Sequence, residues 1–183
     1  NAKTFNMSVT ELDHPLVAHH LSILRDEATP PSLFRQQVQR IAMLLAVEVS
    51  RDLKLIDRPT KTPLTMMKGS QLASRIALVP ILRAGLGLVD PMLQLLPDAE
   101  VRHLGMYRDE ATSEPVEYYC KLPEGNAPEV AMVLDPMLAT GGSIRMAVSA
   151  LERWGVTDIR VISVIGTQFG IDRLLMEYPK VRV

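Results

Sequence analysis

Two short runs of consecutive apolar residues, together with a third strand-like segment, most constrain how this chain can fold. The runs span residues 76–81 and 130–134, the third segment spans residues 159–165, and segments with helical spacing follow them along the chain. A strand in a sheet with one solvent-exposed face alternates apolar and polar residues, whereas a strand in a sheet buried on both faces is apolar throughout. Such strands alternating with helices predict an α/β fold, a Rossmann-like, mainly parallel sheet flanked by helices.

Apolar stripes and end signals indicate the other elements. Ser32 is the expected N-cap of the first strong helix, which continues to about residue 49. Other helices are expected over residues 86–96, from residue 143 to a stop at Gly155, and over residues 171–178. A further strand is expected over 101–107, and the polar, proline-containing segment 57–69 predicts a loop or a short edge hairpin.

The size and charge of the chain limit how many domains it can contain and which partners it can bind. It has 183 residues, of which 47% are hydrophobic, with 20 Lys and Arg against 21 Asp and Glu. This length and apolar content predict a single domain over residues 1–183. The chain lacks the basic excess that non-specific phosphate binding needs, so no nucleic-acid partner is expected.

Cysteine content and hydropathy predict a cytoplasmic protein without a membrane partner. Cys120 is the only cysteine, so the chain can form no internal disulfide and no cysteine-based zinc site. No apolar run reaches the roughly 18 residues of a membrane span, and residues 1–7 lack the apolar core of a secretory signal. Residues 179–183 alternate like a strand that stops early, so the protein is expected to continue beyond Val183.

In open parallel sheets, ligands bind beyond the carboxyl ends of the strands. The residues that follow the predicted strands are therefore the candidates for a site: 82–87, 108–114, 135–143 and 166–170.

The segment after the second apolar run carries the clearest chemical signal. It consists of Asp135, Pro136, Met137, Leu138, Ala139, Thr140, Gly141, Gly142 and Ser143. Glycines allow the backbone to approach a ligand closely, and free N–H groups at a helix start attract an anion, together with the hydroxyls of Thr140 and Ser143. Asp135 is a good acceptor for sugar hydroxyls. The segment therefore predicts a site for a phosphorylated ribose.

Simpler interpretations stay open at this point. Gly141 and Gly142 can serve only as a strand-to-helix turn, Arg83 can be a structural ion-pair residue, and residues 108–110 can be a solvated charged turn. The adjacent His19 and His20 would point in different directions on a helix, so no metal site is expected. Two other phosphate-binding motifs are absent, because there is no G-x-x-x-x-G-K-[ST] sequence and no complete G-x-G-x-x-G.

Four segments, taken together and in order, resemble one enzyme family. They are DHPLVAHHLSILRDEATPPSLFR at 13–35, VPILRAGLGLVD at 79–90, GMYRDEATSEPVEYYCKLP at 105–123 and VLDPMLATGGS at 133–143. On these motifs the chain resembles the uracil phosphoribosyltransferases. The resemblance implies a type I phosphoribosyltransferase fold with a projecting β-hairpin arm, here at 114–121. It also implies that uracil and phosphoribosyl pyrophosphate (PRPP) give UMP and pyrophosphate.

The same resemblance implies roles for individual residues. Arg83 and Arg108 would contact the PRPP phosphates, and residues 135–143 would hold the ribose hydroxyls and the 5′-phosphate; Arg108 and Asp135 are the expected catalytic residues. Pro136 stands where many relatives in the wider superfamily carry a second acid. Mg²⁺ would arrive on PRPP without a metal site on the protein, GTP is a possible activator, and a homodimer or homotetramer is expected.

One motif of the family is missing from the sequence. The family's glycine-rich uracil-recognition segment, similar to GYIVPGLGDAGD, does not occur before Val183. No residue is therefore assigned to uracil binding. The alternative function is a catalytically silent regulator of the same fold that senses PRPP or a nucleotide.

Overall fold

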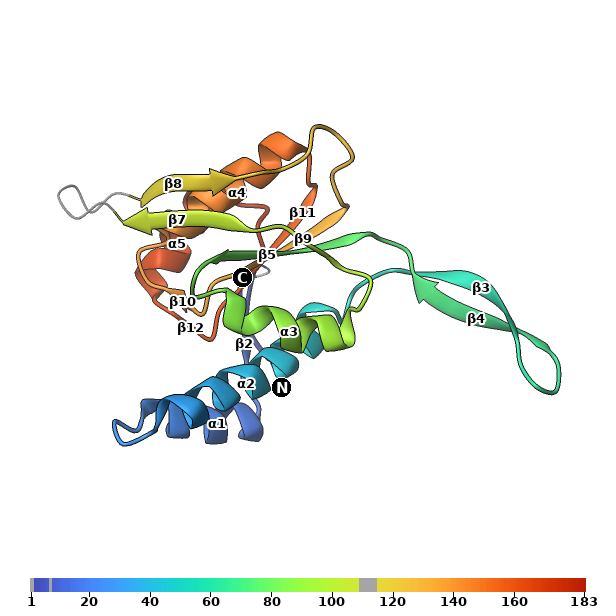
Figure 1. Ribbon diagram of the computed structural model, residues 1–183, viewed down its shortest axis with the longest axis horizontal. Helices are drawn as coiled ribbons and strands as arrows, with labels where there is room; N and C mark the ends of the chain where they lie inside the picture. The colour runs from blue at the N-terminus through green and yellow to red at the C-terminus, as the bar shows by residue number, and fades with distance from the viewer. Residues whose placement is uncertain (1, 7, 109–114) are drawn as a thin grey trace.

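The apolar runs form the centre of a sheet whose strands are mainly parallel (Figure 1). The structure is a computed structural model that describes residues 2–6, 8–108 and 115–183. The sheet has the order β11-β9-β5-β7-β8, with β6 also paired to β5. Its strands are β5 (Ile76–Leu82), β6 (Glu100–Val101), β7 (Leu104–Arg108), β8 (Pro115–Cys120), β9 (Val130–Leu134) and β11 (Asp158–Ile162). Only the β7–β8 pairing is antiparallel, which confirms the predicted α/β class.

The central strands are apolar throughout because helices cover both faces of the sheet. Val79 and Val133 belong to the core that β5 and β9 share with α4 (Gly142–Trp154) and α5 (Gln168–Glu177). Leu78 and Met132 belong to the opposite core, shared with α2 (Pro31–Val49) and α3 (Leu86–Leu95). Figure 1 shows α4 and α5 on one side of the sheet and α2 and α3 on the other, with α1 (Pro15–Arg25) packed on α2.

The helix ends agree with the sequence except at two N-termini. α4 ends at Gly155, which has a φ of +105°, as predicted. The prediction of Ser32 as an N-cap is wrong, because α2 begins at Pro31 with Pro30 in the cap position. Proline fits the first helical position, since its fixed φ suits the helix and its missing N–H would be unpaired there anyway. α5 begins at Gln168, three residues before the expected start, because Thr167 caps it.

Two predicted strands are shorter than expected. The segment 101–107 is divided between β6 and β7, and the run 159–165 ends at Ile162. Beyond it, β12 (Ile165–Gly166) pairs in parallel with β10 (Met137–Leu138), outside the main sheet.

A long hairpin stands out from the body of the molecule, at the right of Figure 1. It consists of β3 (Leu55–Lys61) and β4 (Met66–Leu72), which pair only with each other among the residues described. The sequence predicts a loop or a short edge hairpin here; the hairpin is present, but it joins no sheet edge. The arm expected over 114–121 is β8, which pairs with β7 at the sheet edge, while residues 109–114 lie outside the described part of the chain.

The two ends of the chain meet beside β11. β1 (Ala2–Asn6) and β2 (Val9–Leu12) form a hairpin, and the Val183 N–H donates to the Ser8 carbonyl at 2.7 Å. The Thr10 N–H donates to the Val183 carbonyl at 2.8 Å, and Arg182 forms a parallel bridge with Arg160 of β11. The strand-like alternation of residues 179–183 thus corresponds to a short extension of the sheet.

A buried ion cluster holds this end of the chain in place. Arg160 is only 4% exposed, and its guanidinium donates to Asp52 at 2.7 Å and to Asp158 at 2.7 Å. Arg182 also bonds both carboxylates. Burial opposes ionisation of Asp52 and Asp158, yet hydrogen bonds from the two arginines hold the pKa of each carboxyl below its ordinary value.

Replacing Arg160 tests this cluster. Arg160→Met should lower the free energy of unfolding by about 1–2 kcal/mol, because it removes one of the two arginines that bond Asp52 and Asp158, and Arg182 and solvent compensate only in part. The two lowered pKa values contribute stability that is present above pH ~4 and lost as pH falls through the folded-state values. Urea unfolding at pH 7 and at about pH 2.5, below the ordinary carboxyl pKa, measures both effects. Arg51→Met, which removes an exposed pair with Glu48, should change little.

Candidate substrate site at the carboxyl edge of the sheet

The structure brings the predicted site segments to one edge of the sheet. Arg83 follows β5, Arg108 ends β7, Asp135 follows β9 and Ser163 follows β11. Because β5, β7, β9 and β11 are mutually parallel, these four positions lie beyond the same ends of the strands. The loops meet near β10 and β12 in Figure 1. The Arg108 side chain lies outside what the structure describes.

The turns after β5 and β9 are in close contact. A Cβ atom at Gly85 would lie 2.2 Å from the Leu134 carbonyl oxygen, so only glycine fits here. Arg83, joined to Leu82 by a cis peptide bond, has an exposed side chain. Its guanidinium forms no ion pair or hydrogen bond with any residue that the structure describes. The structure therefore gives no support to the interpretation of Arg83 as a structural ion-pair residue, and its cation faces solvent beside Asp135's strand.

Asp135 is held by the backbone on both sides. Its N–H donates to the Ile162 carbonyl at 3.2 Å, and its Oδ1 accepts from the Met137 N–H at 3.2 Å. Burial raises the pKa of the Asp135 carboxyl, and the hydrogen bond from Met137 offsets only part of this shift. The Asp135 side chain is half-buried, and the Met137 N–H holds one of its oxygens, which leaves the other free to accept from ligand hydroxyls.

The rest of the loop presents backbone N–H groups rather than side chains. Leu138 is fully buried and anchors the loop in the core, whereas Ala139 and Thr140 are exposed. Gly141, with a φ of +75°, leads into α4. The N–H groups of Ala139, Thr140 and Gly141 donate to no group of the described residues. A bare turn would explain the glycines but would leave these donors unpaired, so the geometry favours an anion site.

The segment after β11 contacts this loop along its length, which the sequence does not reveal. The N–H groups of Val164 and Ile165 donate to the Pro136 carbonyl at 3.1 and 3.2 Å. Thr167 donates to the carbonyls of Leu138 and Ala139, and a Cβ atom at Gly170 would lie 2.3 Å from the Ala139 oxygen. In the sequence, only the position of residues 166–170 after a predicted strand marks them as candidates. No local pattern shows which residues they contact.

Other candidates from the sequence lie away from this edge or have ordinary packing roles. Burial raises the pKa of the Cys120 thiol, which packs on the core beside α4. His14 caps α1 by accepting from the Leu16 N–H at 3.1 Å. No group of three or more His, Cys, Asp or Glu that could hold a metal ion occurs among residues 2–6, 8–108 and 115–183.

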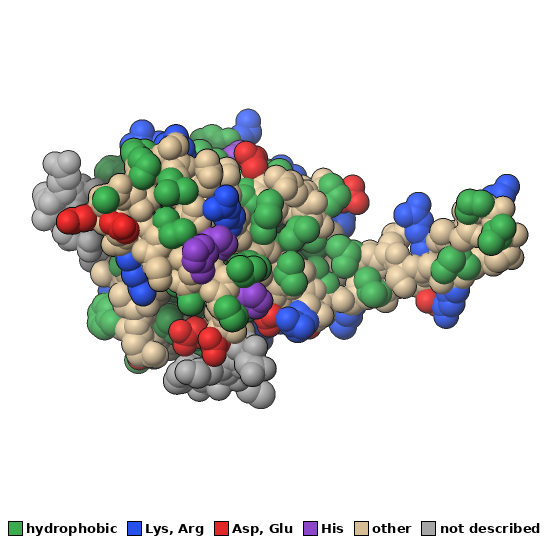
Figure 2. Space-filling model, turned by 90° about the horizontal axis from the view of Figure 1, so that it is seen from below, with side chains coloured by type: hydrophobic (Ala, Val, Ile, Leu, Met, Phe, Trp, Pro, Cys, Tyr) green, Lys and Arg blue, Asp and Glu red, His purple; other side chains and the backbone are tan. Residues whose placement is uncertain are grey.

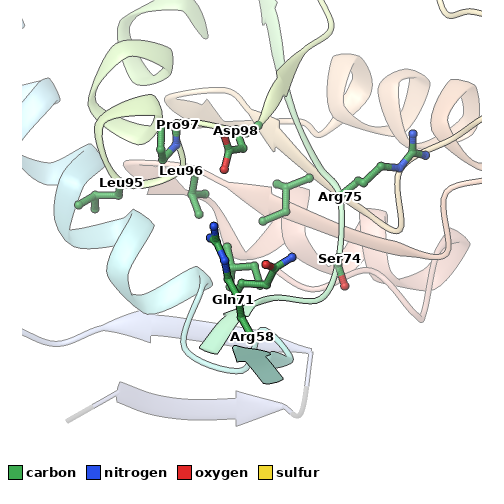
Figure 3. A pocket seen from close by; sticks show the side chains of 11 residues that line it. Arg58, Gln71, Ser74, Arg75, Leu95, Leu96, Pro97 and Asp98 are labelled. Carbon is green, nitrogen blue, oxygen red and sulfur yellow. The ribbon is translucent and has the colours of Figure 1, made fainter. Parts of the chain in front are cut away.

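A separate pocket lies at the opposite end of β5 (Figure 3). It is bounded by the base of the β3–β4 hairpin and by the end of α3, with Arg58 and Asp98 at its rim and Leu96 in its wall. The Arg75 side chain points away from it and bonds the carbonyls of Asn126 and Ala127. Ile76 begins β5 here, whereas Arg83 follows its far end, so this pocket is not part of the candidate site.

Comparison with solved structures first shows which fold the chain has. The fold is shared with a purine phosphoribosyltransferase from Pyrococcus horikoshii, at a TM-score of 0.53 and 13% identity over 73% of this chain and 76% of that one. The architecture is thus that of the type I phosphoribosyltransferases.

Sequence comparisons then give the particular family. The family model "Uracil phosphoribosyltransferase" matches residues 11–183, and the chain belongs to this family. A uracil phosphoribosyltransferase from Thermoanaerobacter sp. (strain X514) is 46% identical over 177 residues, which cover 96% of this chain and 84% of that protein. One from Roseiflexus castenholzii is 49% identical over 93% of this chain and 82% of that protein. The structure of the AQ2163 protein from Aquifex aeolicus matches at a TM-score of 0.89 with 31% identity, over 95% of this chain and 84% of that one.

The raised pKa of Asp135 makes a prediction about stability and pH. A carboxyl whose pKa is higher in the folded than in the unfolded state destabilises the fold as pH rises through that interval, because the unfolded state releases its proton more readily than the folded state does. Asp135→Asn should therefore raise the melting temperature at pH 7, and this gain should disappear below pH ~4. Calorimetry at the two pH values measures it. An unchanged or lower melting temperature at pH 7 would contradict the proposed cost of burying the charge.

Proposed function

We propose that the protein transfers the phosphoribosyl group of PRPP to uracil, giving UMP and pyrophosphate. The observation that carries the proposal is the loop 135–143, in which a half-buried carboxylate and a run of backbone donors without a partner in the described residues lie on one turn. Membership of the family supports the same reaction, since its relatives bear that enzyme's name. No observation favours the silent regulator that the sequence left open.

In this reaction a nitrogen of uracil bonds to C1 of the ribose while the bond from C1 to the pyrophosphate oxygen breaks. The uracil nitrogen loses its proton, and the pyrophosphate leaves with the electron pair. Positive charge grows on the sugar ring and negative charge on the leaving group. Groups fixed in advance around both charges lower the barrier, because they need no rearrangement as the charges develop.

We assign the two ends of PRPP to different groups of this site. The N–H groups of residues 139–143, with the hydroxyls of Thr140 and Ser143, bind the 5′-phosphate at the start of α4. Asp135 accepts from the ribose hydroxyls and, as an anion, favours positive charge on the ring. Arg83 and Arg108 bind the pyrophosphate, for which the planar guanidinium is well suited. We assign no residue of this chain to uracil.

We also propose that Mg²⁺ enters bound to PRPP. Mg²⁺ prefers oxygen ligands, keeps several waters and binds substrate phosphates readily, so the pyrophosphate oxygens and water can supply its coordination. It would shield the charge of the leaving group. GTP is proposed as an activator on family resemblance alone, and its addition to the assay tests that proposal.

Steady-state assays with uracil, PRPP and Mg²⁺ test the reaction and its site. UMP should form, and chelation of Mg²⁺ should abolish its formation. Arg83→Ala and Arg108→Ala should each lower kcat/KM for PRPP about tenfold or more, the usual effect of losing a charged hydrogen bond. Arg173→Ala, a variant of an exposed arginine on α5, serves as the control and should keep wild-type kinetics. Formation of a purine nucleotide in place of UMP would overturn the base assignment.

We propose that the protein is a homo-oligomer with the β3–β4 hairpin as a subunit contact. A two-stranded hairpin alone is marginally stable in water, and this one stands clear of the body in Figure 2. It nevertheless exposes large apolar side chains, with Leu64 95%, Leu55 62% and Met66 60% exposed. Burying them against a second copy would stabilise the hairpin and remove an apolar surface from water.

Charged substitutions on the hairpin test this contact. Leu64→Glu combined with Met66→Glu should shift the wild-type oligomer toward a smaller species in sedimentation velocity. Met176→Glu, on α5, is a matched control, because Met176 is 86% exposed and lies outside the hairpin. A monomeric wild-type protein would overturn the proposal, as would an oligomer that both variants leave intact.

The proposed place of action is the cytoplasm. The described helices include none with the length and apolar character needed to cross a membrane. PRPP and UMP are charged metabolites that do not cross a bilayer unaided, which favours the compartment where they are made and used. Fractionation of cells that express the protein tests this proposal.

A further inference from the structure

We propose that Thr167 is a positioning residue for the substrate loop, which orients the backbone N–H groups of Ala139 and Thr140 toward the 5′-phosphate of PRPP. The inference rests on the proposed function, because it concerns the same loop. It adds a residue at the start of a different element, 28 positions away in the chain, whose hydroxyl bonds the loop backbone.

Thr167 bonds two consecutive carbonyls of the loop. Its backbone N–H donates to the Leu138 carbonyl at 2.9 Å, and its hydroxyl donates to the Ala139 carbonyl. The hydroxyl in turn accepts from the Gly170 N–H at 3.0 Å, which caps α5. A threonine hydroxyl has one donor and two acceptor positions, so a single side chain can link α5 to the loop in this way.

These bonds fix the direction of two peptide planes. A trans peptide is flat, with its C=O and N–H on opposite sides. The Leu138 carbonyl shares a peptide with the Ala139 N–H, and the Ala139 carbonyl shares one with the Thr140 N–H. Because both carbonyls point to Thr167, both N–H groups point away from α5. They are among the loop donors that find no partner in the described residues.

The first turn of α5 is packed closely against the loop. A Cβ atom at Gly170 would lie 2.3 Å from the Ala139 oxygen and 2.5 Å from Leu138 Cδ2, so the first turn of α5 lies directly against the loop. Gly141 has a similar contact, since its Cβ would lie 3.1 Å from the Gly170 carbonyl oxygen. The hydroxyl of Thr167 is thus the part of this contact that a substitution can remove without changing the fit.

The orientation of these loop N–H groups affects binding of the 5′-phosphate end of PRPP only. A phosphate bound by oriented N–H groups needs no further ordering of the loop, so binding is stronger than with a loop that must rearrange. PRPP and UMP both carry the 5′-phosphate. Pyrophosphate lacks the sugar and its 5′-phosphate and, in the proposed site, meets Arg83 and Arg108 instead.

Thr167→Val tests the proposal, because valine has nearly the same shape and lacks the hydroxyl. We expect the Kd values for PRPP and UMP to rise about tenfold, as expected for losing a hydrogen bond worth about 1.4 kcal/mol. The Kd for pyrophosphate should stay within about twofold of the wild-type value. KM for PRPP should rise with kcat little changed, because binding is weakened equally in the ground and transition states. Thr167→Ser keeps the hydroxyl and should return the Kd values for PRPP and UMP and the KM for PRPP to their wild-type values.

Thr29→Val is the matched control. The Thr29 hydroxyl also donates to a backbone carbonyl, that of Ile23 at 2.7 Å, but in the turn between α1 and α2. This variant should lose a similar amount of stability and bind all three ligands as the wild type does.

Three results would overturn the proposal: wild-type affinity for PRPP and UMP in Thr167→Val, an equal loss of pyrophosphate affinity in that variant, or failure of Thr167→Ser to restore binding. Isothermal titration measures the affinities without turnover. A wild-type protein that binds PRPP but forms no UMP would instead overturn the proposed reaction, and the affinities would still decide the role of Thr167.

Discussion

The parallel pairing of β9 with β5 and β11 is the constraint on which the site depends. Residues 130–134 pair in register with 76–80 on one side and with 158–162 on the other, so the three strands end at the same edge. This pairing places the Arg83 turn, the Asp135 loop and the segment after Ser163 together, although they are far apart in the sequence. It requires both faces of the sheet to be covered, and the apolar residues of β5 and β9 meet that requirement.

Features set by local patterns could be predicted from the sequence. The apolar runs over 130–134 and 76–81 became the central strands, Gly155 ended α4, and Asp135 followed a buried strand. Ser32 was a reasonable N-cap by residue type, but the preceding proline had the stronger preference for the first helical turn. The prediction of the α2 start was wrong because two local preferences competed there, that of serine for the cap and that of proline for the first helical position.

Features set by distant contacts could not be predicted. Thr167 meets Ala139 across 28 positions, and Arg160 meets Asp52 across 108. Neither pair can be recognised from its spacing or residue types in the sequence, because each contact forms only when the folded sheet brings the two residues together. A hairpin over this part of the chain was one of the two predicted outcomes, but the length of β3–β4 and its separation from every sheet edge were not predicted, because no local pattern sets them.

The hydrogen bonds of Val183 to Ser8 and Thr10 have a mechanical consequence. Because Val183 is hydrogen-bonded directly to Ser8 and Thr10, a force applied across residues 8 and 183 acts on two hydrogen bonds near one edge of the fold. Those bonds would be peeled apart before tension reached β9 or the loop that follows it. The edge that carries Asp135 is thereby separated from a load applied at residues 8 and 183.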